Sequence, residues 1–211
     1  QASSPEGTLE YRVDATSCAG SAMVAVFFYE QDPRNPQQIA GSTSAQHRGR
    51  VRPHPALEVR LDARGTLLSS HADLAAILLD TPVPAGFRPA VLTKTPAVPG
   101  DTLTRVGFGY DETLEALDGR RLVHESKVLK ALTPAGGRFL LEDPDGHIFR
   151  GDDGGPCFRE TRSAPELVGI STTGLGQKST MTSLSAYRGW LRDELSYSAS
   201  LEGCRQPGAP E

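Results

Sequence analysis

Short apolar runs separated by turns constrain the fold of this chain more than any other feature. The longest runs, MVAVFFY at 23–29 and LAAILL at 74–79, have the length of β-strands. Both are far shorter than the roughly 18 apolar residues that a membrane-spanning helix needs. The 22 glycines and 16 prolines recur between such runs and interrupt any long helical pattern. The sequence therefore predicts an all-β protein of many short strands, with no membrane span.

Strands are expected where β-branched and aromatic residues cluster between turn residues. The run inside ADLAAILLD (72–80) is continuously apolar and bounded by charges, which predicts a buried strand. The other expected strands include TLEYRV (8–13), MVAVFFYE (23–30), RLVHESKVLKALT (121–133), RFLLED (138–143), ELVGIST (166–172) and KSTMTSL (178–184).

Helical periodicity is convincing in one segment only. Tyr187, Trp190, Leu191 and Leu195 lie three and four residues apart and would form one apolar face. Ser183 or Ser185 would cap the first turn, so a short helix is expected over about 185–196. We expect residues 1–7 to be a flexible lead-in and residues 201–211 to be a loose tail, with one domain over 8–200 between them.

Charge bears on the choice of partners. The formal net charge of −4 argues against a nucleic-acid binder. The stretch 46–64 is nevertheless locally basic, with five arginines. Its plain interpretation is a solvated loop and strand face. The alternative is a docking patch for a polyanion or an acidic partner, formed by Arg48, Arg50 and Arg52.

The three cysteines, Cys18, Cys157 and Cys204, leave at least one without a partner inside the chain. No CxxC pair and no Cys/His cluster with zinc spacing is present. One disulfide is compatible with an exported protein, although the sequence does not identify the pair. The sequence predicts neither a metal site nor a cofactor.

The loop GDDGGP at 151–156 is the strongest functional motif. Its glycines and proline fix a tight turn, and glycine allows backbone N–H groups to point at a substrate oxygen. A plain turn is the alternative. With the two residues that follow it, the loop resembles the nucleophile loop GDSGGP of the trypsin-like serine proteases.

Six further segments resemble motifs of that family, in the family's order, and together the matches cover nearly residues 7–195. They are TLEYRVDATSCAGSAMVAVFF (8–28), RPHPAL (52–57), HADLAAILLDTPV (71–83), TRVGFGYD (104–111), ELVGISTTGLG (166–176) and TSLSAYRGWLRDEL (182–195). The resemblance implies two antiparallel six-stranded barrels of the trypsin type, over about 8–88 and 100–184, followed by the helix. Bacterial members are the most similar, because other disulfide-forming cysteines of animal members are absent.

The family's chemistry requires a serine nucleophile, a histidine base and an aspartate that orients the histidine. By resemblance, Asp73 keeps the aspartate, Ser17 stands at the histidine position and Asp153 stands at the serine position. A carboxylate is a poor acyl acceptor and repels an oxyanion, and a serine cannot act as a base near pH 7. The resemblance therefore implies a degenerate triad.

These replacements leave two interpretations of the site. Ser17, Asp73 and Asp153 could bind a cation or act as an acid/base pair, with His71 or His147 as a substitute base. Alternatively, the carboxylates only make hydrogen bonds. His71 precedes Asp73 by two residues, so strand alternation would point both side chains the same way.

Other positions depart from the family pattern. His147 falls at the base of the specificity pocket, which argues against a preference for basic residues. Thr173 replaces a bulky tryptophan beside Thr172 and Gly174, in a channel that could still add a strand to a bound peptide. Gly151, Asp152 and Gly154 match the oxyanion loop.

The start of the chain is also unusual by this resemblance. Active members open about 30 residues before TLEYRV, and their new terminal amine pairs with the aspartate that matches Asp152. The first barrel is therefore expected to lack its opening strands and to expose an edge. Residues 1–7, a separately bound chain or a partner protein would cover that edge. In each case Asp152 needs another partner, without which its loop should be mobile.

The function expected from these residues is non-catalytic. We expect a secreted, periplasmic or cell-surface homologue of a serine protease that binds a protein or peptide, for example a chain supplying the missing strands. One alternative is a hydrolase with a non-standard site of Asp153, Asp73 and Ser17, active alone or in a complex. The other is a structural subunit of a larger assembly.

Overall fold

The computed structural model describes residues 2–3, 9–12, 22–28, 31–32, 35–39, 46–64, 67–109, 122–132, 137–142, 151–172 and 179–204. The chain is mostly β, with a helix at its carboxyl end, as predicted. The elements are β1 Ala2–Ser3, β2 Leu9–Arg12, β3 Met23–Val26, β4 Gln31–Asp32, β5 Asn35–Ile39, β6 His47–Pro53, β7 Glu58–Leu61, β8 Leu67–His71, β9 Ala75–Leu79, β10 Val91–Leu92, β11 Thr102–Gly107, β12 Leu122–Ala131, β13 Arg138–Leu141, β14 Pro156–Arg159, β15 Glu166–Thr172, β16 Thr180–Ser183 and α2 Arg188–Cys204.

The carboxyl-terminal half forms a closed antiparallel barrel. Its strand order is β15-β14-β11-β12-β13-β16, and a further pairing of β15 with β16 closes the ring. The short strand β10 adds to β15 in parallel. β13 and β16 are buried at every position. The interior is filled by Leu103, Val128, Phe139, Leu141, Cys157, Val168 and Met181.

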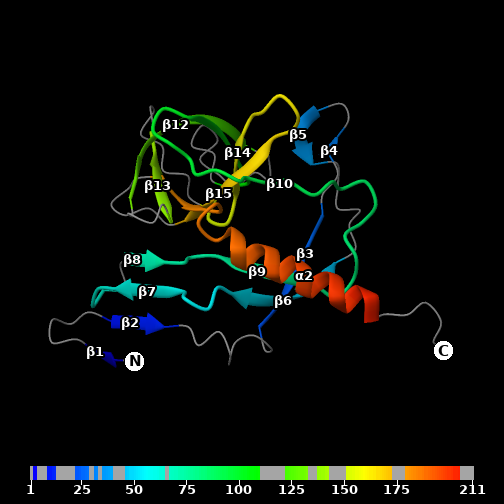
Figure 1. Cartoon of the computed structure of the whole chain (residues 1–211), viewed down its shortest axis with the longest axis horizontal. Helices are drawn as coiled ribbons and strands as arrows, with labels where there is room; N and C mark the ends of the chain where they lie inside the picture. Colours follow the sequence, from blue (N-terminus) through cyan, green and yellow to red (C-terminus); the bar gives the residue numbers. More distant parts are fainter. Residues whose placement is uncertain are drawn as a thin grey trace.

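The amino-terminal half contains smaller sheets, of which β1-β2-β7-β8 and β3-β6-β9 lie below the barrel in Figure 1, whereas β4-β5 lies at its upper right. β6 is the middle strand of the sheet β3-β6-β9, and a second sheet has the order β1-β2-β7-β8. The strands described here do not close into one barrel, so the first barrel stays a prediction. Ala2–Ser3 pairs with β2 and is not part of a flexible lead-in. Three ways to cover the open edge of the first barrel were considered above. This pairing agrees with the one in which residues 1–7 cover it.

The prediction that residues 72–80 form a buried strand is wrong about burial. β9 forms within this range, but Ala75 is exposed and the Ile77 side chain is 48% exposed. Among the strands that the structure describes, β9 pairs only with β6. β9 is therefore an edge strand in the described part of the chain, and its side chains are partly or fully exposed.

The helix α2 runs across β9 in Figure 1, and the two elements are in contact. Tyr187, just before the helix, and its residues Trp190 and Leu191 pack against a second core of Ala72, Leu74 and Leu184. The helix continues to Cys204, so it is longer than predicted, and the first residues of the expected tail are helical. In the described part of the chain, no helix has the length and apolar character needed to cross a bilayer.

Candidate functional site

A cleft of about 470 Å³ lies where β9 meets the barrel. It brings together Asp73, between β8 and β9, and Asp153, in the loop before β14. The segments 71–83 and 151–158, which resemble separate family motifs, therefore meet at one cleft. Most of the wall is apolar or neutral, and its lining residues are Leu57, Asp73, Leu74, Ala75, Ile77, Asp153, Gly154, Ile170, Ser171 and Thr172.

The backbone at Asp73 is held from both halves of the molecule. Ala72 is buried and has a φ of 47°, a left-handed conformation that is uncommon for residues with a side chain. The Leu74 N–H donates to the Ala72 carbonyl at 2.9 Å, and the Thr182 hydroxyl donates to the Asp73 carbonyl at 3.1 Å. Strain of this kind persists only where the surroundings over-determine the conformation. The position of Asp73 in the cleft is thus fixed by packing.

This turn also separates His71 from the cleft. β8 ends at His71, which is exposed, pairs in register with Glu58 and is not among the residues that line the cleft. The expectation that His71 and Asp73 point the same way is wrong, because the left-handed Ala72 ends the strand alternation between them.

Arg138 is the part of the site that the sequence did not reveal. Only 5% of its surface is exposed, and its Nη2 donates to Thr172 Oγ1 at 3.1 Å and to Thr180 Oγ1 at 2.8 Å. Its Nη1 donates to Ser70 Oγ at 3.0 Å, across to the amino-terminal half. Burial lowers the pKa of Arg138, and the carboxylate of Asp73 opposes that shift. A cation therefore lies behind the cleft wall, where it bonds to Thr172.

The GDDGGP loop is tied to β15. Gly151 and Gly154 have φ values of 87° and 85°, which only glycine adopts readily. The Gly154 N–H donates to the Ser171 carbonyl, and the Ser171 N–H donates to the Gly155 carbonyl, both at 2.8 Å. These bonds hold one end of the loop, with Gly154 and Asp153, against the cleft.

Asp152 has a partner within the chain. Its Oδ1 accepts a hydrogen bond from the Gly109 N–H at 2.7 Å, and its carboxylate lies against the backbone of Gly107. A Cβ at Gly107 would lie 1.9 Å from Asp152 Oδ1, so only glycine fits there. The loop was expected to be mobile only if Asp152 had no partner. Because Asp152 has one, that expectation does not apply. Its partner comes from the segment TRVGFGYD, whose glycines are the sequence signal for this close approach.

His54, from the segment RPHPAL, contacts the aromatic residues near the start of α2. Its ring centroid lies 5.0 Å from those of both Tyr187 and Trp190. Burial lowers the pKa of His54, and His71 lowers it further. His54 is not a lining residue of the cleft, so it supports the wall without facing a ligand there.

The predicted patch of three arginines is reduced to two. Arg52 donates through Nη2 to Glu194 Oε1 at 3.1 Å and through Nε to Glu194 Oε2, and it lies 4.6 Å from the centre of the Tyr197 ring. Its charge is used within the fold, because it joins β6 to α2. Arg48 and Arg50 are exposed.

Cys157 is free and fully buried in the barrel. Desolvation raises the pKa of its thiol to about 12. This cysteine does not take part in a disulfide. Ser17, Cys18, His147, Thr173 and Gly174 lie outside the described residues, so their predicted roles stay predictions.

The described lining of the cleft limits its chemistry. It contains two carboxylates and two hydroxyl side chains, but no histidine or cysteine. The Thr172 hydroxyl already bonds to Arg138 and Thr180. Within the described segments, no group of three or more His, Cys, Asp or Glu side chains could hold a metal ion.

Comparisons with known proteins find similarity at the level of the fold. No protein-family model matches the chain, and no curated protein matches it. The structure is similar to kallikrein-related peptidase 10 in complex with Zn²⁺, with a TM-score of 0.52 and 21% sequence identity over 74% of this chain and 75% of that chain. A second similar structure is neuropsin, a serine protease expressed in the limbic system of mouse brain, with a TM-score of 0.49 and 19% identity over 57% of this chain and 60% of that chain. The first similarity shows a trypsin-like serine protease fold.

Proposed function

We propose that this protein, whose fold is trypsin-like, is catalytically inactive and binds a peptide or a segment of a partner protein in its cleft. The observation that carries the proposal is the carboxylate of Asp153 in the cleft lining, at the position that matches the family's serine. A carboxylate there would attack a peptide carbonyl poorly and would repel the developing oxyanion. The other triad replacement, Ser17, also removes the base.

The second carboxylate has a role that does not involve catalysis. In an active triad the aspartate holds the histidine in one tautomer. Here the buried guanidinium of Arg138 lies near Asp73 and bonds to Thr172, which is also part of the cleft wall. Asp73 is thus explained as the counter-ion of Arg138, without a histidine.

The walls of the cleft favour an extended peptide as the ligand. Leu57, Ile77 and Ile170 offer apolar surface, and β9, which lines the cleft, is an edge strand among the strands that the structure describes. A peptide strand can bind to such an edge through main-chain hydrogen bonds, with alternate side chains in apolar pockets. In line with its resemblance to a family of mostly exported proteins, we place this activity in a secreted, periplasmic or cell-surface protein.

Peptide selection followed by affinity measurement tests the proposal. Peptides selected from a random library on the folded protein should bind through the cleft, and Ile77→Ser should weaken them by roughly tenfold, since a buried apolar contact is lost. Val83→Ser is the matched control, because Val83 is 51% exposed and does not line the cleft. Equal effects of the two substitutions, or no selectable peptide, would contradict cleft binding and favour a structural subunit.

A further inference from the structure

The sheet β3-β6-β9 has a second surface, on the side opposite the cleft. Side chains of directly paired residues in antiparallel strands share a face. Arg50 pairs with Met23 on one side and with Leu78 on the other, and Val51 pairs with Ile77. Ile77 lines the cleft, so Arg50 and its partners lie on the reverse face.

The exposed residues of this reverse face form a defined patch, which we call the β3–β6 face. Arg48 pairs with Ala25 in the same register, and all of Met23, Ala25, Arg48 and Arg50 are exposed. Phe27 continues the alternation beyond β3 and is 46% exposed, while Met23 is 47% exposed. The intervening residues Val24 and Val26 are partly buried, and Gly49 is buried. The face therefore combines two guanidinium groups with apolar side chains.

The two arginines carry positive charge that the described fold does not balance with ion pairs. Arg52, on the same face, is paired with Glu194, whereas neither Arg48 nor Arg50 has an ion pair with any residue that the structure describes. Asp80 is a nearby acidic group, just after β9, and its N–H donates to the Arg48 carbonyl. Like charges two positions apart on one strand face repel, and an acidic ligand would relieve that repulsion.

From this arrangement we infer that the β3–β6 face docks an acidic segment of a partner protein that also carries apolar side chains. The apolar members of the face decide between the two kinds of polyanionic partner. A sulfated or phosphorylated polymer would neutralise Arg48 and Arg50 but would leave Met23 and Phe27 exposed to water. An acidic, apolar protein segment satisfies both the charge and the apolar surface. Because this face is opposite the cleft, its partner and a cleft ligand can bind together.

Fluorescence anisotropy with labelled synthetic peptides tests this inference on the full chain. The probes are short peptides that alternate leucine with glutamate, serine or lysine, together with a sulfated polysaccharide as competitor. The glutamate peptide should bind best and should weaken with added salt. Arg48→Glu/Arg50→Glu should weaken its binding by roughly tenfold or more and should favour the lysine peptide instead. Met23→Ser should weaken the glutamate and serine peptides alike.

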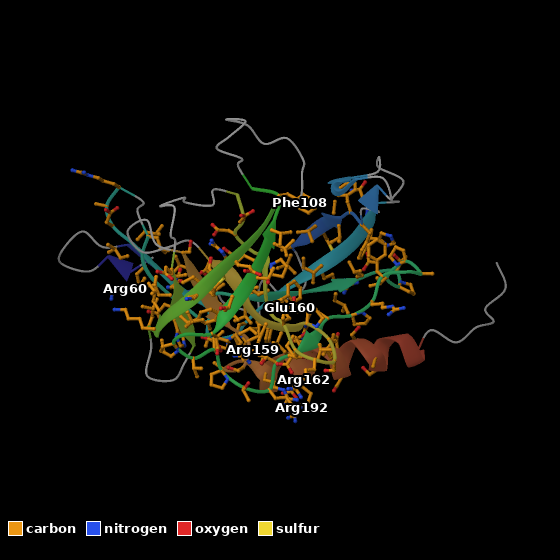
Figure 2. All side chains as sticks on the ribbon, turned by 90° about the horizontal axis from the view of Figure 1, so that it is seen from above. Arg60, Phe108, Arg159, Glu160, Arg162 and Arg192 are labelled. Carbon is orange, nitrogen blue, oxygen red and sulfur yellow. The ribbon has the colours of Figure 1, made fainter. Side chains whose placement is uncertain are left out.

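Two controls make the result specific to the face. Arg162→Glu reverses an exposed arginine at the periphery of the barrel half (Figure 2) and should leave binding unchanged. Ile77→Ser, which alters the cleft, should also leave it unchanged, so failure here is distinguishable from failure of the cleft proposal. Arg48→Gln/Arg50→Gln gives an intermediate affinity if the reversed variant fails to fold.

Three outcomes would overturn the inference. Equal affinity for the glutamate and serine peptides would show that the negative charge of the peptide does not contribute to binding. Unchanged binding in both double-arginine variants would place the peptide elsewhere. Binding of the sulfated polysaccharide through Arg48 and Arg50, without binding of the glutamate peptide, would identify a polyanion surface.

Discussion

At the scale of single residues, Arg138 explains the most about the cleft. A buried guanidinium is tolerated only where hydrogen bonds and a nearby negative charge replace its hydration. Ser70, Thr172 and Thr180 provide hydrogen-bond acceptors, and Asp73 provides the charge. The same contacts join the two halves of the molecule, so the charge of Asp73 contributes to stability.

Substitution of Arg138 tests this role. Arg138→Met should lower the free energy of unfolding by about 3 kcal/mol, because Ser70, Thr172 and Thr180 lose their hydrogen-bond donor. Asp73→Asn should then be less destabilising in the Arg138→Met background than in the wild type, by at least about 0.5 kcal/mol. Denaturant unfolding of the four proteins measures this coupling. As a control, Arg162→Met, at an exposed arginine, should change stability by less than about 0.5 kcal/mol. Additive effects of Arg138→Met and Asp73→Asn would refute an interaction between the two residues.

Cys157 gives the molecule a dependence on alkaline pH. Burial raises the pKa of its thiol from an ordinary 9.0 to about 12, so the folded state keeps the proton that the unfolded state loses. The contribution to stability is complete below pH 9 and declines between pH 9 and pH 12, by roughly 4 kcal/mol at most. Unfolding of the wild type and Cys157→Ala across this range should show a steeper decline for the wild type. Parallel curves, or rapid alkylation of the native thiol at pH 8, would contradict this account.

Sequence reasoning located some of these residues and missed others for a physical reason. Asp73 and Asp153 could be predicted because each lies within a short motif that is recognisable from its own stretch of sequence. The structure places both in one cleft. Arg138 was missed because its partner Ser70 is 68 residues away in the sequence. An arginine at the start of the apolar segment RFLL gives no local sign that the fold will bury it. The amide of Gly109 as partner for Asp152 is non-local in the same way.

At the scale of elements, the salt bridge between Arg52 and Glu194 fixes α2 on the sheet. It joins β6 to the middle of the helix with two hydrogen bonds, and Tyr197 covers the guanidinium. Bidentate pairs of this kind are more stabilising than ordinary surface ion pairs because the two groups are partly desolvated. The hydrogen bond to Glu194 raises the pKa of Arg52, in line with this view.

Adjacent acidic residues on α2 allow a matched test of the anchor. Glu194→Ala should lower the free energy of unfolding by about 1 kcal/mol, because Arg52 loses its bidentate partner. Asp193→Ala, at the exposed neighbouring position, should have an effect within about 0.5 kcal/mol of zero. Thermal unfolding of the two variants measures the difference. Equal stability of both variants would show that the helix is held by its apolar contacts alone.

The errors in predicting elements have a common cause. The sequence pattern correctly identified β15 and the presence of the final helix, because those patterns are local, although the helix begins at Arg188 and not near residue 185. β9 was expected to be buried because its residues are apolar, but burial depends on which strand lies beside it. The helix was expected to end near residue 196 because its apolar face ends there. Its backbone continues to Cys204, since no proline interrupts it before Pro207.

At the scale of the whole molecule, a trypsin-like fold is combined with a cleft whose described lining lacks a nucleophile–base pair. The loop that would form the oxyanion site is held by the bonds of Asp152, Gly154 and Ser171. In the proposed function, the shape of the cleft is kept, whereas the reactive residues of the family that the sequence resembles are not. A binding protein needs the first property and does not need the second.

Peptide cleavage is the measurement that tests the central claim most directly. A diverse peptide mixture is incubated with the purified wild type, with Asp153→Ala and with the double variant Ser17→His/Asp153→Ser, and the products are identified by mass spectrometry. The account predicts no cleavage by the wild type or by Asp153→Ala, and cleavage by the double variant alone would add that the scaffold still supports a triad. Cleavage by the wild type that is lost in Asp153→Ala would contradict the account, because Asp153 would then belong to a working active site.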